Sequence, residues 1–112
     1  MPFTIIRQDI TEMEVDAVVN AANTELRMGG GVCGAIFKAA GADRLREACA
    51  RLAPIEPGDA VITPGFDLPA RFVIHAAAPV YSGKNPERSI RLLRSAYTNA
   101  LRRAVESGCE TV

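Results

Sequence analysis

The residues with the strongest chemical character lie in one stretch, NAANTELRMGGGVCGAI, at positions 20 to 36. It contains two asparagines, three consecutive glycines and a cysteine, namely Asn20, Asn23, Gly29 to Gly31 and Cys33. An amide side chain both donates and accepts hydrogen bonds, which suits a sugar diol. Glycines expose backbone N–H groups, and a helix that begins after them adds a favourable field for phosphate. The stretch therefore predicts a site for a phosphate or a pyrophosphate.

Two familiar phosphate-binding motifs fit these glycines poorly. Gly29, Gly31 and Gly34 have the GxGxxG spacing of dinucleotide-binding folds, but eight residues separate Gly29 from Asn20, where we expect the preceding strand to end. In that fold the glycines follow their strand directly. A Walker A loop needs GK[ST], which the stretch does not contain. A glycine turn without any ligand stays open as the alternative.

The elements around the stretch alternate between strands and helices. Apolar and β-branched runs predict strands at 3–8, 17–19, 60–63 and 71–77. Helical spacing predicts helices at 35–40, from Asp43 as a capping residue to just before Pro54, and from Glu87 or Ser89 to Ser107. The last residues, CETV, are predicted to open a further strand. This alternation indicates an α/β layered domain, in which ligands usually lie at the carboxyl ends of the strands.

Size and charge limit the function further. The 112 residues, 48% hydrophobic and 23% charged, indicate one globular domain and exclude a disordered or fibrous chain. Thirteen basic residues balance thirteen acidic ones, which argues against nucleic acid as a partner. A local patch of Arg88, Arg91 and Arg94 leaves an RNA-binding or nucleotide-binding role open as a third possibility.

The N-terminus carries charges and no long apolar run, so we expect neither a signal peptide nor a membrane span, and a cytoplasmic location. Cys33, Cys49 and Cys109 lack CxxC spacing and are predicted to be free thiols. We expect no metal and no cofactor.

The only histidine, His75, lies in the apolar run FVIHAAA. A lone histidine invites an acid–base role, but buried polar groups normally have hydrogen-bond partners. We therefore expect His75 to be a buried, hydrogen-bonded structural residue. Phe66 and Tyr81 are predicted to be packing residues rather than platforms for a ligand.

Two longer segments carry a family resemblance. QDITEMEVDAVVNAANTELRMGGGVCGAIFKAAG, followed by PGDAVITPGFDLPARFVIHAAAPVY, resembles the macrodomain family of ADP-ribose-binding proteins over essentially the whole chain. The resemblance implies a three-layer α/β/α sandwich with a mixed sheet, in one domain spanning residues 1–112. It implies ADP-ribose or an ADP-ribosylated protein as the partner. The implied activity is hydrolysis of ADP-ribosyl-protein or of O-acetyl-ADP-ribose esters, with a non-catalytic ADP-ribose reader as the alternative.

The resemblance also assigns roles to polar residues. Asp9 corresponds to the residue that accepts a hydrogen bond from the adenine amino group, and Ile10 to one that lines the adenine pocket. Asn23 corresponds to the asparagine that reaches the ribose distal to adenine, and Asn20 to the one that braces the loop. Without the resemblance, a turn residue at the end of a strand stays open as the alternative interpretation of Asp9.

The glycine loop of the family wraps the diphosphate and the distal ribose through backbone N–H groups. The corresponding residues are Gly29, Gly30, Gly31, Val32, Cys33 and Gly34. Hydrolytic members commonly carry an aspartate at the position of Cys33, where it helps to activate or position the attacking water. Asn23 and Cys33 are thus the catalytic candidates, although Cys33 also fits as a small turn residue. Phe37 and Gln8 replace a histidine and a glycine that are often found in the family.

Family members typically continue past the position of Val112 into a strand, a second glycine-containing phosphate loop, a helix and another strand. Without these elements the strand predicted at 3–8 loses its neighbour, which leaves backbone groups unpaired. We therefore expect a fragment of a longer protein. An oligomer that exchanges or pairs strands along the open edge of the sheet is the alternative.

Overall fold

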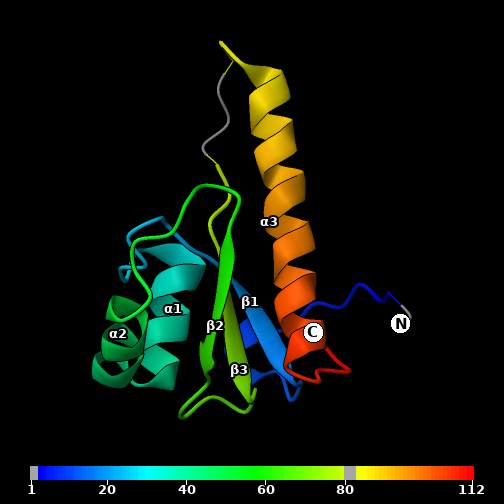
Figure 1. The fold of residues 1–112 in the computed structure, drawn as a ribbon. Coiled ribbons are helices and arrows are strands. Elements are labelled where there is room, and N and C mark those ends of the chain that lie inside the picture. Colours follow the sequence, from blue (N-terminus) through cyan, green and yellow to red (C-terminus); the bar gives the residue numbers. More distant parts are fainter. Residues whose placement is uncertain (1–2, 80–82) are drawn as a thin grey trace.

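The computed structural model describes residues 3–79 and 83–112. Its strands are β1 (Ala17–Ala21), β2 (Ala60–Pro64) and β3 (Phe72–Ala76), and its helices are η1 (Ile10–Glu12), α1 (Gly31–Ala40), α2 (Ala42–Ala50) and α3 (Pro86–Glu106). The short α1 and α2 cover one face of the sheet, and the long α3 covers the other (Figure 1). The predicted three-layer α/β architecture is confirmed for the described residues.

The sheet is mixed and has the order β1-β3-β2. Strand β3 pairs in parallel with β1 and antiparallel with β2. In this register His75 lies opposite Asn20 on one side and Val61 on the other. The central strand therefore brings a polar residue of β1 next to the only histidine.

Alternation along the strands divides the core into two parts. Val18 and Val73 pack towards α1 and α2, whereas Ala17 and Ile74 pack towards α3. The buried residues of α3 that join the second cluster are all small: Ala96, Ala100 and Ala104. Because alanine side chains are short, this long helix can lie close against β2 and β3.

The helix ends follow local sequence signals with several corrections. Helix α1 begins at Gly31, earlier than the predicted 35, and α2 ends at Ala50 instead of just before Pro54. Helix α1 stops at Gly41, as predicted, where φ is 104°. Helix α2 begins at Ala42, so Asp43 lies inside its first turn and pairs with Arg46 at 3.3 Å instead of capping the helix. Helix α3 begins at Pro86, slightly earlier than predicted, because the Asn85 side chain accepts a hydrogen bond from the N–H of Arg88.

The predicted strand at 3–8 is wrong. These residues have no strand pairing and lie on the surface (Figure 1), with Phe3 88% exposed. An alternating β-branched segment forms a strand only where a neighbour completes its hydrogen bonds, and no described segment pairs with it.

The strand predicted to open in CETV does not form either. Instead, Thr111 accepts a hydrogen bond from the N–H of Ala17 at 3.1 Å. The Asp16 carboxylate accepts hydrogen bonds from the N–H groups of Glu110 (2.7 Å) and Thr111 (3.2 Å). The C-terminal residues are therefore held beside the start of β1 without being part of the sheet.

Candidate ligand-binding site

The segment between β1 and α1 is mostly exposed and is anchored to the core by Leu26. Leu26 adopts a left-handed conformation with φ of 54° and is buried beneath the segment. Its N–H donates to the carbonyl of Asn23 at 3.1 Å, and the N–H of Ile55 donates to the carbonyl of Thr24 at 2.8 Å. A buried leucine and a hydrogen bond from a distant segment thus hold the polar stretch in one place.

Asn23 forms two hydrogen bonds with Arg27. Its Nδ2 donates to the Arg27 carbonyl at 2.9 Å, and its Oδ1 accepts from the Arg27 N–H at 3.0 Å. The side chain is exposed, and an amide retains a second N–H and a second lone pair after these two bonds. Asn23 is therefore held in one orientation while it can still hydrogen bond to a ligand.

Asn20 and Cys33 connect this turn to the interior. The Asn20 Nδ2 lies 3.6 Å from the Cys33 Sγ and 3.1 Å from the His75 Nδ1. The Cys33 thiol in turn donates to the Arg27 carbonyl at 3.7 Å. The Arg27 carbonyl thus links Asn23, which bonds to it directly, with Asn20, which contacts it through Cys33. The Asn20 Oδ1 is buried and has no partner among the described residues.

His75 lies at the inner end of this network. Its Nε2 is 3.0 Å from the Thr63 Oγ1 and 3.7 Å from the Cys49 Sγ, and burial lowers its pKa to about 4. Burial, together with the neighbouring Cys33, raises the pKa of the Cys49 thiol to about 11. The prediction of a buried, hydrogen-bonded His75 is confirmed. Tyr81, predicted to be a packing residue, lies outside the described residues.

The glycines expose a row of backbone donors at the start of α1. The N–H of Gly34 reaches the Gly30 carbonyl at 3.3 Å, but no described residue accepts from the N–H groups of Gly29 to Cys33. Gly30 precedes the helix without a side-chain cap. Five consecutive N–H groups at a helix N-terminus form a favourable environment for an anion.

Two of the glycines are required by geometry. Gly31 has φ of 57°, a conformation that other residues adopt at a cost. A Cβ on Gly34 would lie 2.5 Å from the carbonyl oxygen of Gly29, so a side chain there would displace the loop. Gly30 has open space around it and no such requirement.

Ile10 begins η1, which packs on α1, and the exposed Asp9 caps η1. The Asp9 Oδ1 accepts from the Oγ1 of Thr11 at 2.7 Å and from its N–H at 2.9 Å, and these hydrogen bonds lower the pKa of the carboxyl group. No described residue bonds the other oxygen, so Asp9 caps η1 while it keeps an acceptor free. Ile10 is partly buried against the core cluster beneath α1.

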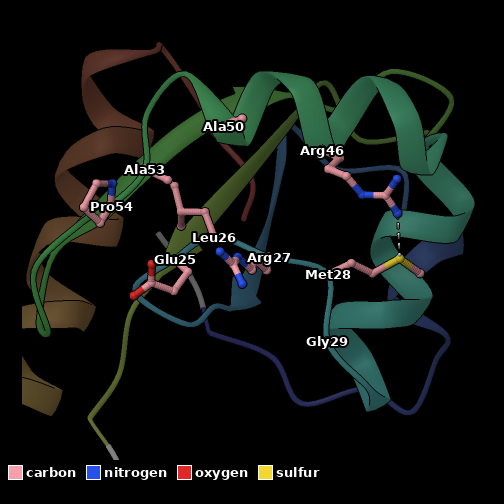
Figure 2. Close-up of a pocket in the computed structure, with 9 residues that line it drawn as sticks. All are labelled: Glu25, Leu26, Arg27, Met28, Gly29, Arg46, Ala50, Ala53 and Pro54. Atoms are coloured by element: carbon pink, nitrogen blue, oxygen red, sulfur yellow. Dashed lines mark hydrogen bonds between the residues drawn. The ribbon is translucent and has the colours of Figure 1, made fainter.

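A larger hollow lies on the other side of the polar stretch. This cleft has a volume of about 780 Å³ and lies between the 25–29 segment, α2 and the residues after α2. Figure 2 shows the residues that line it. Its lining residues are Glu25, Leu26, Arg27, Met28, Gly29, Arg46, Ala50, Ala53 and Pro54. Of the residues that the sequence predicts for ligand binding, only Gly29 lines it. We take the row of N–H groups as the candidate anion site, because its five consecutive backbone donors have no acceptor among the described residues.

Sequence reasoning missed Arg27. Its contribution comes from its backbone carbonyl and N–H, which every non-proline residue carries, so no residue type at position 27 could have signalled it.

Comparisons with known proteins agree with this arrangement. The family model described as Macro domain matches residues 19–112. The chain is 51% identical over 108 residues to a macro domain-containing protein of Lactiplantibacillus plantarum, covering 96% of this chain and 62% of that protein. It is 48% identical over 112 residues to a protein of Enterobacter sp. named O-acetyl-ADP-ribose deacetylase, covering 96% of this chain and 61% of the relative.

A solved structure shares the fold. The Trypanosoma brucei macrodomain in complex with ADP-ribose matches with a TM-score of 0.79 and 40% identity, covering 92% of this chain and 41% of that one. The chain belongs to the macro domain family. It spans about three fifths of the length of the curated relatives above.

Two features are absent from the part of the chain that the structure describes. No group of three or more histidine, cysteine, aspartate or glutamate residues in 3–79 and 83–112 is arranged to hold a metal ion. No helix in the same residues is long and apolar enough to cross a membrane.

Proposed function

We propose that this chain binds ADP-ribose at the start of α1 and hydrolyses ADP-ribosyl-protein or O-acetyl-ADP-ribose esters. The observation that carries the proposal is the row of N–H groups from Gly29 to Cys33 that no described residue occupies. A diphosphate is the part of the ligand whose charge and oxygen atoms match such a row. The names of the Enterobacter relative and the T. brucei structure support the same ligand.

Asn23 orients the distal ribose in this proposal. Its exposed amide, held by two bonds to Arg27, has a donor and an acceptor left for adjacent hydroxyl groups. Asp9 offers its free carboxylate oxygen to the adenine amino group, and Ile10 packs beside the base. A water molecule, polarised by the ligand's own phosphate, attacks the ester carbonyl or the anomeric carbon. In the ester, the hydroxyl bonds to the acyl carbon, the bond from that carbon to the ribose oxygen breaks, and the proton goes to the ribose oxygen. In the ADP-ribosyl-protein, the hydroxyl bonds to the anomeric carbon, the bond from that carbon to the side chain breaks, and the proton goes to the side-chain atom that leaves. The reaction is proposed for the cytoplasm and needs no metal or cofactor.

A non-catalytic reader is the second candidate, and Cys33 favours it. The Cys33 side chain is only 8% exposed, and its sulfur bonds to Asn20 and Arg27. It therefore presents little surface from which to orient a water molecule. A reader needs the N–H row and Asn23, but it needs no group that activates water.

The first experiment is isothermal titration of the chain with ADP-ribose, with AMP as the control ligand. AMP retains the adenosine and one phosphate, but it lacks the diphosphate and the distal ribose. We expect saturable binding of ADP-ribose and much weaker binding of AMP. Equal affinity for the two ligands would contradict a site built on the diphosphate and the distal ribose, and no binding by a folded sample would overturn the proposal.

Turnover then separates the two candidates. Release of acetate from O-acetyl-ADP-ribose should fall on the order of 100-fold in Asn23→Ala, the usual effect of removing one positioned donor. Asn85→Ala is the matched control. Asn85 lies at the start of α3, and its side chain also accepts a hydrogen bond from a backbone N–H group. Wild-type binding without turnover would identify a reader. In that case Cys33→Asp tests whether the side chain of residue 33 faces the scissile bond. We expect added turnover in this variant only if it does.

A further inference from the structure

The cleft shown in Figure 2 adjoins the candidate anion site. Gly29 lines the cleft and also carries the first N–H group of the row at the start of α1. Arg27, another lining residue, holds the Asn23 side chain through two backbone hydrogen bonds of 2.9 and 3.0 Å. The cleft therefore begins beside the residue that orients the distal ribose in the proposed function, and it extends from there along α2 to Pro54.

The size of the cleft favours one of the two proposed substrates. Its volume of about 780 Å³ lies within the range of pockets that enclose drug-sized molecules. The acetyl group of O-acetyl-ADP-ribose has only a few heavy atoms and would leave almost all of this space empty. A polypeptide segment that carries ADP-ribose on one side chain would instead lie along the cleft. The cleft thus fits an ADP-ribosyl-protein better than the small ester.

Two arginines give the cleft a positive charge. Arg27 is exposed, and its guanidinium forms no ion pair in the part of the chain that the structure describes. The Arg46 Nη2 donates to the Met28 Sδ at 3.9 Å, and its Nη1 lies 3.3 Å from a carboxylate oxygen of Asp43, whose side chain is 99% exposed. Such an exposed ion pair is weak, so Arg46 can bind another carboxylate. Glu25 is the one acidic residue in the lining.

The two arginines are spaced along the cleft. Glu25 lies towards one end, Arg46 lies above Met28 at the other, and Arg27 lies between them (Figure 2). The short side chain of Ala50 leaves room on the α2 side of the cleft. An extended segment with carboxylates at intervals can therefore contact both guanidinium groups, while its backbone passes over the alanine. Arginine clusters recognise acidic motifs in this way.

The lining argues against a nucleic acid as the occupant. No residue that lines the cleft is aromatic, so unpaired bases would have no ring on which to stack. Glu25 would repel a phosphate backbone, in which every unit carries a negative charge. A peptide can place a neutral residue opposite Glu25 and acidic residues opposite the two arginines. The charge pattern therefore favours an acidic polypeptide.

We propose that the cleft binds an acidic segment of the protein that carries the ADP-ribose, with carboxylates beside Arg27 and Arg46. The inference rests on the proposed function, because it takes the distal ribose to lie over Asn23. The modified side chain meets the ribose next to Arg27, and acidic residues that flank it in the segment follow the cleft to Arg46. The cleft then selects among modified proteins, whereas the row of N–H groups binds the part of the ligand that all of them share.

The test compares free ADP-ribose with two peptides of equal length that carry ADP-ribose through a non-hydrolysable linkage. Glutamates flank the modified residue in one peptide, and lysines flank it in the other. Isothermal titration should show that the glutamate peptide binds about tenfold tighter than free ADP-ribose and that the lysine peptide binds no tighter. This gain in affinity should largely disappear at about 0.5 M salt, because the charges are exposed.

Arg46→Glu should abolish the gain in affinity, while free ADP-ribose should bind as it does to the wild type. Arg51→Glu is the matched control, because Arg51 at the end of α2 also forms an exposed ion pair, at 2.9 Å with Glu47, but does not line the cleft. The control should keep the gain. An equal loss in the two variants, or equal affinity for the glutamate and lysine peptides, would overturn the proposal.

A titration with the unmodified glutamate peptide separates this inference from the proposed function. Amide chemical shifts of Met28, Arg46 and Ala50 should change, whereas those of Gly30 and Gly31 should not. Such changes in a protein that fails to bind ADP-ribose would support the cleft and contradict the proposed function. If ADP-ribose binds but neither glutamate peptide changes the cleft signals, the inference is overturned and the proposed function stands. A single-stranded RNA that changes these signals more strongly would also overturn the inference.

Discussion

The thiol of Cys33 donates to the carbonyl of Arg27 across 3.7 Å, and the Asn23 amide donates to the same oxygen at 2.9 Å. A helix residue and the candidate ribose-binding residue are therefore coupled through one backbone carbonyl. Because Cys33 also contacts Asn20, the orientation of Asn23 depends on the buried network below it. Four tests follow from this coupling and from the contacts around it.

Cys33→Ala should loosen the Asn23 turn. It removes the thiol donor to Arg27 and the acceptor for Asn20, at a cost of about 1–2 kcal/mol in the free energy of unfolding. Cys33→Ser, which keeps a donor and an acceptor on a shorter side chain, is expected to lose less. Urea unfolding measures the stability, and titration with ADP-ribose reports on the turn. Equal stability of the alanine variant and the wild type would contradict the role of the sulfur.

Gly34→Ala should disrupt the start of α1. The added Cβ would lie 2.5 Å from the Gly29 carbonyl oxygen, so Gly29 must move and the row of N–H groups moves with it. We expect a loss of about 2 kcal/mol in the free energy of unfolding and weaker ADP-ribose binding. Gly30→Ala is the matched control, because its Cβ meets nothing within 4 Å. If both variants behave alike, the close approach at Gly34 has no consequence.

Stability should fall as the pH drops from about 6.5 to about 4. Burial lowers the pKa of His75 from its usual 6.5 to about 4, so the unfolded chain binds a proton in this range before the folded chain does. The free energy of unfolding should decrease by about 3 kcal/mol across the range. Below the range, the contribution of His75 should no longer change with pH, because the residue is protonated in both states.

Urea unfolding at several pH values measures the decrease, with His75→Gln as the comparison. Glutamine does not titrate, so its curve should lack the part of the decrease that is due to His75. Asp9 and Asp16, whose pKa values are lowered from 3.8, begin to lose their contributions below about pH 5 in both proteins, so their effect cancels in the difference between the two curves. An equal slope in the two proteins would show that His75 is not the titrating group.

Asp16→Ala should release the C-terminal residues. The carboxylate accepts from the N–H groups of Glu110 and Thr111, and these hydrogen bonds lower its pKa. The interaction is therefore present above pH 3.8 and is lost as the pH falls through the lowered pKa. Amide exchange at Glu110 and Thr111 should be about tenfold faster in the variant. Asp43→Ala, which removes an exposed ion pair elsewhere, should leave both amides unchanged.

The sequence was sufficient for the helices and for the three strands of the sheet, because apolar spacing reflects which residues are buried. It was misleading at 3–8, where the alternating pattern is present but no described strand lies beside it. Pairing partners are distant in sequence, so a local pattern does not reveal their absence. The glycines between β1 and α1 were visible from residue type as a possible phosphate loop, whereas the bracing role of Asn20 was implied only by the resemblance to macrodomains. The Arg27 carbonyl was not, because a backbone atom leaves no trace in the sequence.

The pairing of Asn20 with His75 also determines how the sheet is aligned. A shift of β3 by one residue would turn His75 towards the alanines of α3, where no hydrogen-bond partner is available, and would place Ile74 against Asn20. If β3 carried only apolar side chains, the two alignments would differ little in stability, because apolar side chains would be buried in both. The histidine makes one alignment much more stable than the other, so it selects the register from which the loop and the start of α1 take their positions.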